Sequence, residues 1–222
     1  MQPAFSVIFL TTLIGAAQGL FLALFGTELF GLEGLGAQES QALFNTGSSV
    51  ALVLASLALL ASFFHLGHPE RAWRSAAMWR SSWLSREVIA IPVFTAGLFV
   101  YGVSHWLGVT GTKALGAVVA LACLVLFVCT AMIYASIRFL QEWASALTLV
   151  NYFLLGCASG LTLATALAAL TGVSALVQSY AMAAAALTAL AWVTRSASLV
   201  RNARLIPAIW VVFQHFILMA QS

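Results

Sequence analysis

Long apolar runs, separated by short polar breaks, take up most of this 222-residue chain. Only 7% of the residues are charged and 63% are hydrophobic, whereas a soluble domain carries about 25% charged residues. Even a large soluble fold leaves much of its chain on a wet surface. So few charges therefore exclude a soluble enzyme and a nucleic-acid binder, and the sequence predicts an integral membrane protein.

The apolar runs are long enough to cross a bilayer as helices, each of which needs about 20 residues. They predict an all-α bundle of about seven transmembrane helices, forming one domain over residues 1–222. Two runs carry a pair of glycines four residues apart, Gly15 with Gly19 and Gly156 with Gly160. This spacing lets two membrane helices approach closely. The expected spans are about 4–26, 43–66, 87–107, 113–137, 147–170, 174–194 and 205–220.

Charged residues are divided unevenly between the two ends of the predicted helices. We name side A the face that carries the N-terminus, and side B the opposite face. The side A residues are Arg71, Arg74, Arg80, Arg86, Arg138, Arg195, Arg201, Arg204, Glu70, Glu87 and Glu142, and the side B residues are Lys113, Glu28, Glu33 and Glu39. Because loops rich in Lys and Arg stay in the cytoplasm, side A and the N-terminus are expected to be cytoplasmic.

Tryptophan follows the same asymmetry. Trp and Arg are common anchors of protein interfaces, so we expect side A to be a docking surface for a partner protein. A thick interfacial belt around a long loop is the alternative. The residues at or near side A are Trp73, Trp79, Trp83, Trp143, Trp192 and Trp210, and Trp106 is near side B.

Polar side chains inside the spans have simple structural interpretations. Amides such as Gln18 and Asn151 are expected to form hydrogen bonds between helices, and the three cysteines to pack as small apolar residues. Glu28, at the outer end of the first span, is expected to be solvated. No carboxylate lies near the middle of a span, so we expect no proton pump.

Residues 63–87, between the second and third spans, concentrate the side chains that carry chemistry. His65 closes an apolar helix, at the depth of a quinone head group whose isoprenoid tail stays in lipid. A quinone site needs hydrogen-bond partners for the ring oxygens and a titratable group, and neutral imidazole donates, accepts and titrates at about pH 6.5. Glu87 could pass protons onward, and a nearby Arg could hold that carboxylate ionised or bind a carbonyl oxygen. An ordinary positively charged loop is the alternative.

The run His65-Leu66-Gly67-x-Pro69-x-Arg71-Ala72, followed by Ser81-x-x-Leu84-Ser85-x-Glu87, resembles the membrane anchor subunits of dimethyl sulfoxide reductase-type molybdoenzymes. The resemblance covers most of the chain, but its specific motif is this one loop. It implies a bacterial inner-membrane anchor that binds menaquinone or ubiquinone and is not catalytic alone. Its partners would be a four-cluster iron–sulfur subunit and a molybdopterin catalytic subunit, docked on the Arg- and Trp-rich face, in anaerobic or sulfur respiration.

The same resemblance assigns the site residues. His65 would bind the quinone head group, Glu87 would relay protons, and Arg71 and Arg86 would bind the quinone or tune the carboxylate. Members of the family usually have eight spans, so an eighth helix is expected to be absent or to lie outside this sequence. The cytoplasmic orientation makes a sulfite:quinone oxidoreductase as plausible a complex as a dimethyl sulfoxide reductase.

Other readings of the sequence remain open. His105 and His215 fall toward side B on different spans and could in principle pair around a haem. Two packed histidines are the alternative, and because the resembled anchors are haem-free we expect no haem, with iron–sulfur clusters and molybdopterin only in partner subunits. A small transporter, which needs polar residues at the midplane, and a purely structural anchor are the competing functions.

Overall fold

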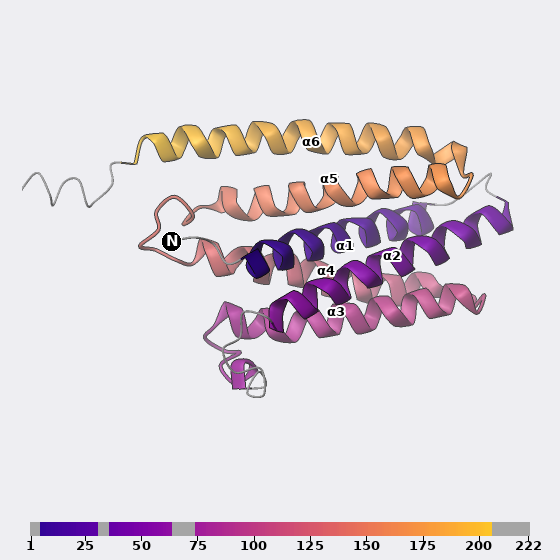
Figure 1. The fold of residues 1–222 in the computed structure, drawn as a ribbon, viewed down its shortest axis with the longest axis horizontal. Coiled ribbons are helices and arrows are strands. Elements are labelled where there is room, and N and C mark those ends of the chain that lie inside the picture. Colours follow the sequence, from indigo (N-terminus) through magenta and orange to yellow (C-terminus); the bar gives the residue numbers. More distant parts are fainter. Residues whose placement is uncertain (1–4, 31–35, 64–73, 206–222) are drawn as a thin grey trace, which may run out of the picture.

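The computed structural model describes residues 5–30, 36–63 and 74–205. In these ranges the chain forms helices and no strands, and six of the helices are long and apolar enough to span a membrane. They lie side by side in one bundle, and successive helices run in opposite directions (Figure 1). The helices are α1 (Phe5–Phe30), α2 (Ala37–Phe63), α3 (Trp83–Trp106), α4 (Thr112–Ala135), α5 (Ala146–Leu170) and α6 (Ser174–Ala203). The predicted all-α membrane fold is confirmed.

The helices differ from the expected spans mainly where they extend beyond the apolar runs. α2 begins at Ala37 instead of near residue 43, and α6 continues to Ala203 instead of ending near residue 194. Hydropathy marks the part of a helix that lies in hydrocarbon, whereas backbone hydrogen bonding continues into the polar region beyond it. The seventh expected span, about 205–220, lies outside the described residues apart from Leu205.

The closest contact in the bundle joins the backbones of α1 and α5. A Cβ atom on Gly19 would lie 2.9 Å from Cys157 Cα, and one on Gly160 would collide with the backbone of Gly19 and Leu20. Only glycine therefore fits at these two positions. The two small-residue patterns in the sequence are confirmed as a packing surface, and they pack against each other.

The contact between α1 and α5 repeats once per helical turn, because the two helices run in the same direction (Figure 1). Thr11, Gly15 and Gly19 face Tyr152, Gly156 and Gly160, and each pair is separated by the same 141 residues along the chain. At the first pair, the Tyr152 hydroxyl donates to the Thr11 carbonyl at 3.3 Å. The glycine contact therefore fixes where Tyr152 lies relative to α1.

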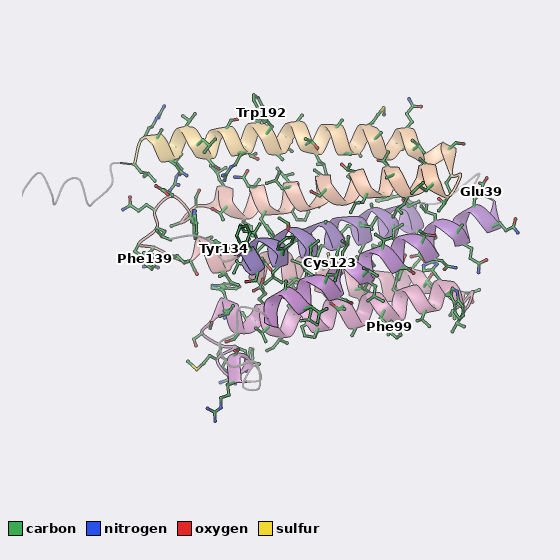
Figure 2. All side chains as sticks on the ribbon, viewed as in Figure 1. Glu39, Phe99, Cys123, Tyr134, Phe139 and Trp192 are labelled. Atoms are coloured by element: carbon green, nitrogen blue, oxygen red, sulfur yellow. The ribbon has the colours of Figure 1, made fainter. Side chains whose placement is uncertain are left out.

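α4 packs against both of these helices. The Gln18 side chain of α1 donates from Nε2 to the Cys123 carbonyl at 2.8 Å, which confirms its predicted role between helices. The ring of Phe127 lies over Gly156, where a Cβ atom would come within 2.7 Å of it. Cys123 itself is fully buried, as its apolar surroundings in the sequence predict, and Figure 2 shows it near the middle of the bundle.

α6 lies at the edge of the bundle and packs along α5 (Figure 1). The Asn151 amide of α5 donates to Ser198 Oγ of α6 at 2.8 Å, again as predicted for an amide inside a span. Trp192 points away from α5 on the outer face of α6 (Figure 2) and is 73% exposed. It lies about 16 Å before the end of the helix and about 27 Å beyond its start at Ser174, a length close to the thickness of the hydrocarbon core. The expected position of Trp192 near side A stays a prediction.

Replacing Gly160 with Ala should weaken the bundle, because the added methyl group has no space between the α1 and α5 backbones. We expect a loss of about 1–3 kcal/mol or more, seen as a lower thermal unfolding midpoint of the detergent-solubilised protein. Gly26→Ala is the matched control, since a Cβ atom at Gly26 meets nothing within 4 Å. Equal midpoints for the two variants would contradict the close contact.

Candidate functional site

Glu87 is buried near the side A end of α3. Its side chain faces α4, where the fully buried Thr130 donates a hydrogen bond to Glu87 Oε1 at 2.6 Å, and the residue as a whole is only 4% exposed. A buried carboxyl group is costly unless it is hydrogen-bonded. Thr130 contributes part of that compensation, and it holds one carboxyl oxygen at a defined position between α3 and α4.

Arg86, the neighbour of Glu87 in the sequence, performs a different task. Its guanidinium donates from Nε to the Trp79 carbonyl at 2.9 Å and from Nη2 to the Arg80 carbonyl at 2.8 Å. It also stacks over the Trp83 ring, 4.2 Å from the centroid. Successive residues on a helix point about 100° apart, so Arg86 faces the preceding loop while Glu87 faces the bundle. Arg86 thus fastens residues 79–80 to the start of α3.

An apolar groove runs between α3 and α4 on the outside of the bundle, and we name it the α3–α4 groove. Its volume is about 450 Å³, and Arg86, Trp79 and Cys129 line it nearest side A. The rest of the lining is aliphatic, and includes Val93 and Leu121 deeper in the bilayer. Arg86 and Cys129, which line the groove, precede Glu87 and Thr130 in the sequence. Glu87 and Thr130 do not line the groove, because they face each other between α3 and α4.

Two tyrosine side chains lie near the Glu87 carboxyl group. This carboxyl group lies within electrostatic range of the Tyr134 and Tyr152 hydroxyls. Tyr134 lies near the side A end of α4 (Figure 2), and Tyr152 lies in the second turn of α5. Single hydroxyl groups inside apolar runs carry no distinctive sequence signal, so Thr130 and Tyr152 could not be found from the sequence.

Two of the four site residues expected from the sequence lie in the described part of the chain. Glu87 and Arg86 lie at the side A end of α3, on different sides of that helix. His65 and Arg71 lie outside the described residues, as does His68.

A second buried carboxyl group lies at side B. The Glu28 side chain is only 10% exposed, and it accepts a hydrogen bond from the Tyr101 hydroxyl at 2.6 Å and another from the Thr112 hydroxyl. The expectation that Glu28 is solvated was therefore wrong. The end of an apolar run need not reach water when neighbouring helices supply hydrogen-bond donors. This group joins the ends of α1, α3 and α4.

His105 belongs to the same side B group. Its ring stacks on Phe44 with centroids 4.4 Å apart, and its Nε2 lies 3.7 Å from Glu28 Oε2. His105 therefore contacts α1 and α2. His215, the histidine considered with it as a haem ligand, lies outside the described residues.

Comparison with known proteins identifies the class to which this bundle belongs. The chain matches the family described as DMSO reductase anchor subunit (DmsC) over residues 1–218. It is also 53% identical over 182 residues to a sulfite dehydrogenase subunit from Allochromatium vinosum, a match that covers 76% of the chain and 56% of that protein. The chain thus spans about half the length of this relative. No solved structure matches it.

The family match extends over nearly the whole chain, so the protein belongs to the DMSO reductase anchor subunit family. The resemblance carried by the loop between the second and third spans is confirmed.

Replacing Tyr101 with Phe should destabilise the side B end of the bundle. The ring contacts remain, but a buried Glu28 oxygen loses its donor, which costs about 1–3 kcal/mol. Thermal unfolding of the detergent-solubilised protein measures the effect. Tyr180→Phe, which removes a hydroxyl bonded to the neutral Thr27 side chain, should cost less. A larger loss in Tyr180→Phe would contradict a special role for the Glu28 group.

Proposed function

We propose that this chain is the membrane anchor and quinone-binding subunit of a molybdenum-containing sulfite:quinone oxidoreductase. Family membership over residues 1–218 supports the anchor role. Sulfite is favoured over dimethyl sulfoxide as the partner's substrate because the relative at 53% identity is a sulfite dehydrogenase subunit. Oxidation of sulfite to sulfate with one water releases two electrons and two protons. A quinone bound to this chain would receive the two electrons from the partner's iron–sulfur clusters and take up two protons to become quinol.

The buried Glu87 carboxyl beside the α3–α4 groove is the observation that carries the quinone proposal. A quinone is an aromatic ring with a polar edge and a long isoprenoid tail, and small-molecule sites are mostly apolar with a few placed polar groups. The aliphatic part of the groove fits the tail, and its side A end is lined by Arg86 and Cys129, the residues that precede Glu87 and Thr130 in the sequence. His65 and Arg71 complete the proposed site on the strength of the loop motif.

The residues have separate roles in this scheme. Glu87 gives a proton to a quinone oxygen as electrons arrive, and is then reprotonated from side A. Thr130 orients the carboxyl group through its 2.6 Å hydrogen bond. Arg86 holds the loop at residues 79–80 against α3, so that the groove keeps its shape at the head. His65 serves as the hydrogen-bond partner of the quinone head group.

The partner subunits, an iron–sulfur subunit and a molybdopterin catalytic subunit, would dock at side A. Electrons pass to quinone from a cluster in the partner, so the quinone site has to lie just below the docking surface. Large side chains are exposed there, including Met78, Trp79 and Phe139, of which Phe139 is 85% exposed. Aromatic and arginine side chains are common anchors of interfaces. Figure 2 shows Phe139 projecting from the connection between α4 and α5.

Replacing Glu87 with Gln should separate electron transfer to quinone from the partner's own chemistry. In the complex purified through a tag on this chain, reduction of decylubiquinone by sulfite should fall by about 100-fold or more, while reduction of ferricyanide by sulfite persists. Glu39→Gln is the control, because Glu39 is an exposed carboxylate at side B. His65→Arg should have the same selective effect as Glu87→Gln.

Each result discriminates between functions. Quinone reduction in Glu87→Gln and His65→Arg equal to that of Glu39→Gln would reject the quinone site and leave a structural anchor. Copurification of the chain without molybdenum and iron would reject the anchor complex altogether and favour a transporter. A molybdenum-containing complex that reduces dimethyl sulfoxide but does not oxidise sulfite would correct the substrate.

The proposed orientation places side A in the cytoplasm of a bacterial inner membrane. Single cysteines introduced at Phe139 on side A and at Val109 on side B should react oppositely with a membrane-impermeant maleimide in intact spheroplasts: the cysteine at 109 is labelled and the one at 139 is not. The three native cysteines are buried and give little background. Labelling at 139 alone would reverse the orientation.

A further inference from the structure

A polar cleft opens at side A between α5, α6 and the end of α4, and we name it the side A cleft. Its volume is about 390 Å³, and charged or amide side chains line its rim, including Glu142, Arg195 and Asn202. These residues follow the apolar parts of α4 and α6, so the cleft lies at the boundary where water meets the bilayer. Arg201 keeps the rim in place, because its guanidinium donates to the carbonyls of Gln141 and Ala144.

The inner wall of the cleft contains a buried amide, Asn151. Asn151 is only 6% exposed, and its Nδ2 donates to Ser198. Among the described residues, its Oδ1 has no hydrogen-bond partner. A buried amide oxygen is expensive to leave unpaired, and this one belongs to a residue that lines the cleft. The cleft is large enough for several water molecules, and a water that reached this oxygen would satisfy it.

Tyr152 connects the cleft to α1 and α4, through Thr11 and Phe127. It lines the side A cleft and also a second cavity of about 250 Å³ next to Thr11 and Ser159. Its hydroxyl donates to the Thr11 carbonyl at 3.3 Å, a long hydrogen bond, and its ring packs on Phe127 of α4, one turn before Thr130. Thr130 in turn donates to Glu87 at 2.6 Å. The cleft, two hydroxyl groups and the buried carboxyl therefore follow one another in space.

We infer that the side A cleft, Tyr152 and Thr130 form the route by which protons from the aqueous phase reach Glu87. This inference rests on the proposed function, in which Glu87 protonates the quinone. The Tyr152 hydroxyl first turns from the Thr11 carbonyl toward Thr130. A hydronium ion in the cleft then gives a proton to the Tyr152 oxygen as Tyr152 passes its own proton to Thr130, and Thr130 passes its proton to the Glu87 carboxylate. Rotation of both hydroxyls restores the starting state, and neither residue changes its net charge.

The charged groups around the route favour proton transfer from the side A cleft to Glu87 over transfer from the lipid-facing side. Glu142 and Arg195 both line the cleft, so its mouth carries charges of both signs and hydrates readily. On the far side of Glu87, the Arg86 guanidinium stands at the head of the α3–α4 groove, where its positive charge opposes the entry of a proton from the lipid-facing side. Tyr134 lines both cavities, as Tyr152 does.

Tyr152→Phe tests the route by removing one hydroxyl while keeping the ring that packs on Phe127. In the purified complex, reduction of decylubiquinone by sulfite should slow about tenfold, and its solvent isotope effect in D₂O should increase, because proton delivery becomes rate-limiting. Ferricyanide reduction serves as the measure of assembly. Tyr180→Phe, a matched loss of a hydroxyl near side B, should retain the parent rate and isotope effect.

A pair of variants at Thr130 keeps the test decisive if Tyr152→Phe does not assemble. Thr130→Val should slow quinone reduction as Tyr152→Phe does, and Thr130→Ser, which restores a hydroxyl, should recover most of the rate. Parent rates and isotope effects in both Tyr152→Phe and Thr130→Val would overturn the route. If Glu87→Gln is impaired in that case, the proposed function still stands. If Glu87→Gln is also unimpaired, the proposed function fails with it.

Discussion

The contact between the glycines of α1 and α5 determines the arrangement of the rest of the bundle. Helices in lipid gain little from the hydrophobic effect, so close backbone packing and interhelical hydrogen bonds must hold them together. Gly19 and Gly160 let the two backbones touch, and Phe127 of α4 then fits over Gly156. Thr130 lies three residues beyond Phe127 on α4, and this packing brings it against Glu87. The position of the candidate site thus depends on residues that have no chemistry of their own.

The same contact sets the position of Tyr152. Tyr152 precedes Gly156 by one turn on α5, and Thr11 precedes Gly15 by one turn on α1, so the register of the glycines brings the tyrosine hydroxyl to the Thr11 carbonyl. Because α1 and α5 run in the same direction, this register is maintained over three turns. A shift by one turn would carry the hydroxyl about 6 Å away from Thr130, and would break the sequence of hydroxyl groups that leads to Glu87.

How much of this was predictable from the sequence depends on the kind of signal. Apolar runs and paired glycines are periodic, so they predicted the spans and the packing surface that the structure contains. Glu87 was found because it ends the loop at residues 63–87, which concentrates charged side chains, and belongs to the motif that resembles the anchor family. Its partners Thr130 and Tyr152 were not found, because which helix faces which is a property of three-dimensional packing. The different tasks of Arg86 and Glu87 follow from the helical period, but only the structure supplies the Trp79 and Arg80 carbonyls that Arg86 binds.

The two buried carboxyl groups make an instructive contrast, since each accepts a hydrogen bond from a threonine of α4. Thr112 and Thr130 are 18 residues apart, which is five turns and about 27 Å, close to the thickness of the hydrocarbon core. Each carboxyl group therefore lies at one boundary of the bilayer. Glu28 has a donor for each oxygen, Tyr101 for one and Thr112 for the other, and it serves to join helices. Glu87 lies between an apolar groove and a tyrosine that lines a polar cleft. A group that exchanges protons with both a lipid-soluble molecule and water requires this setting.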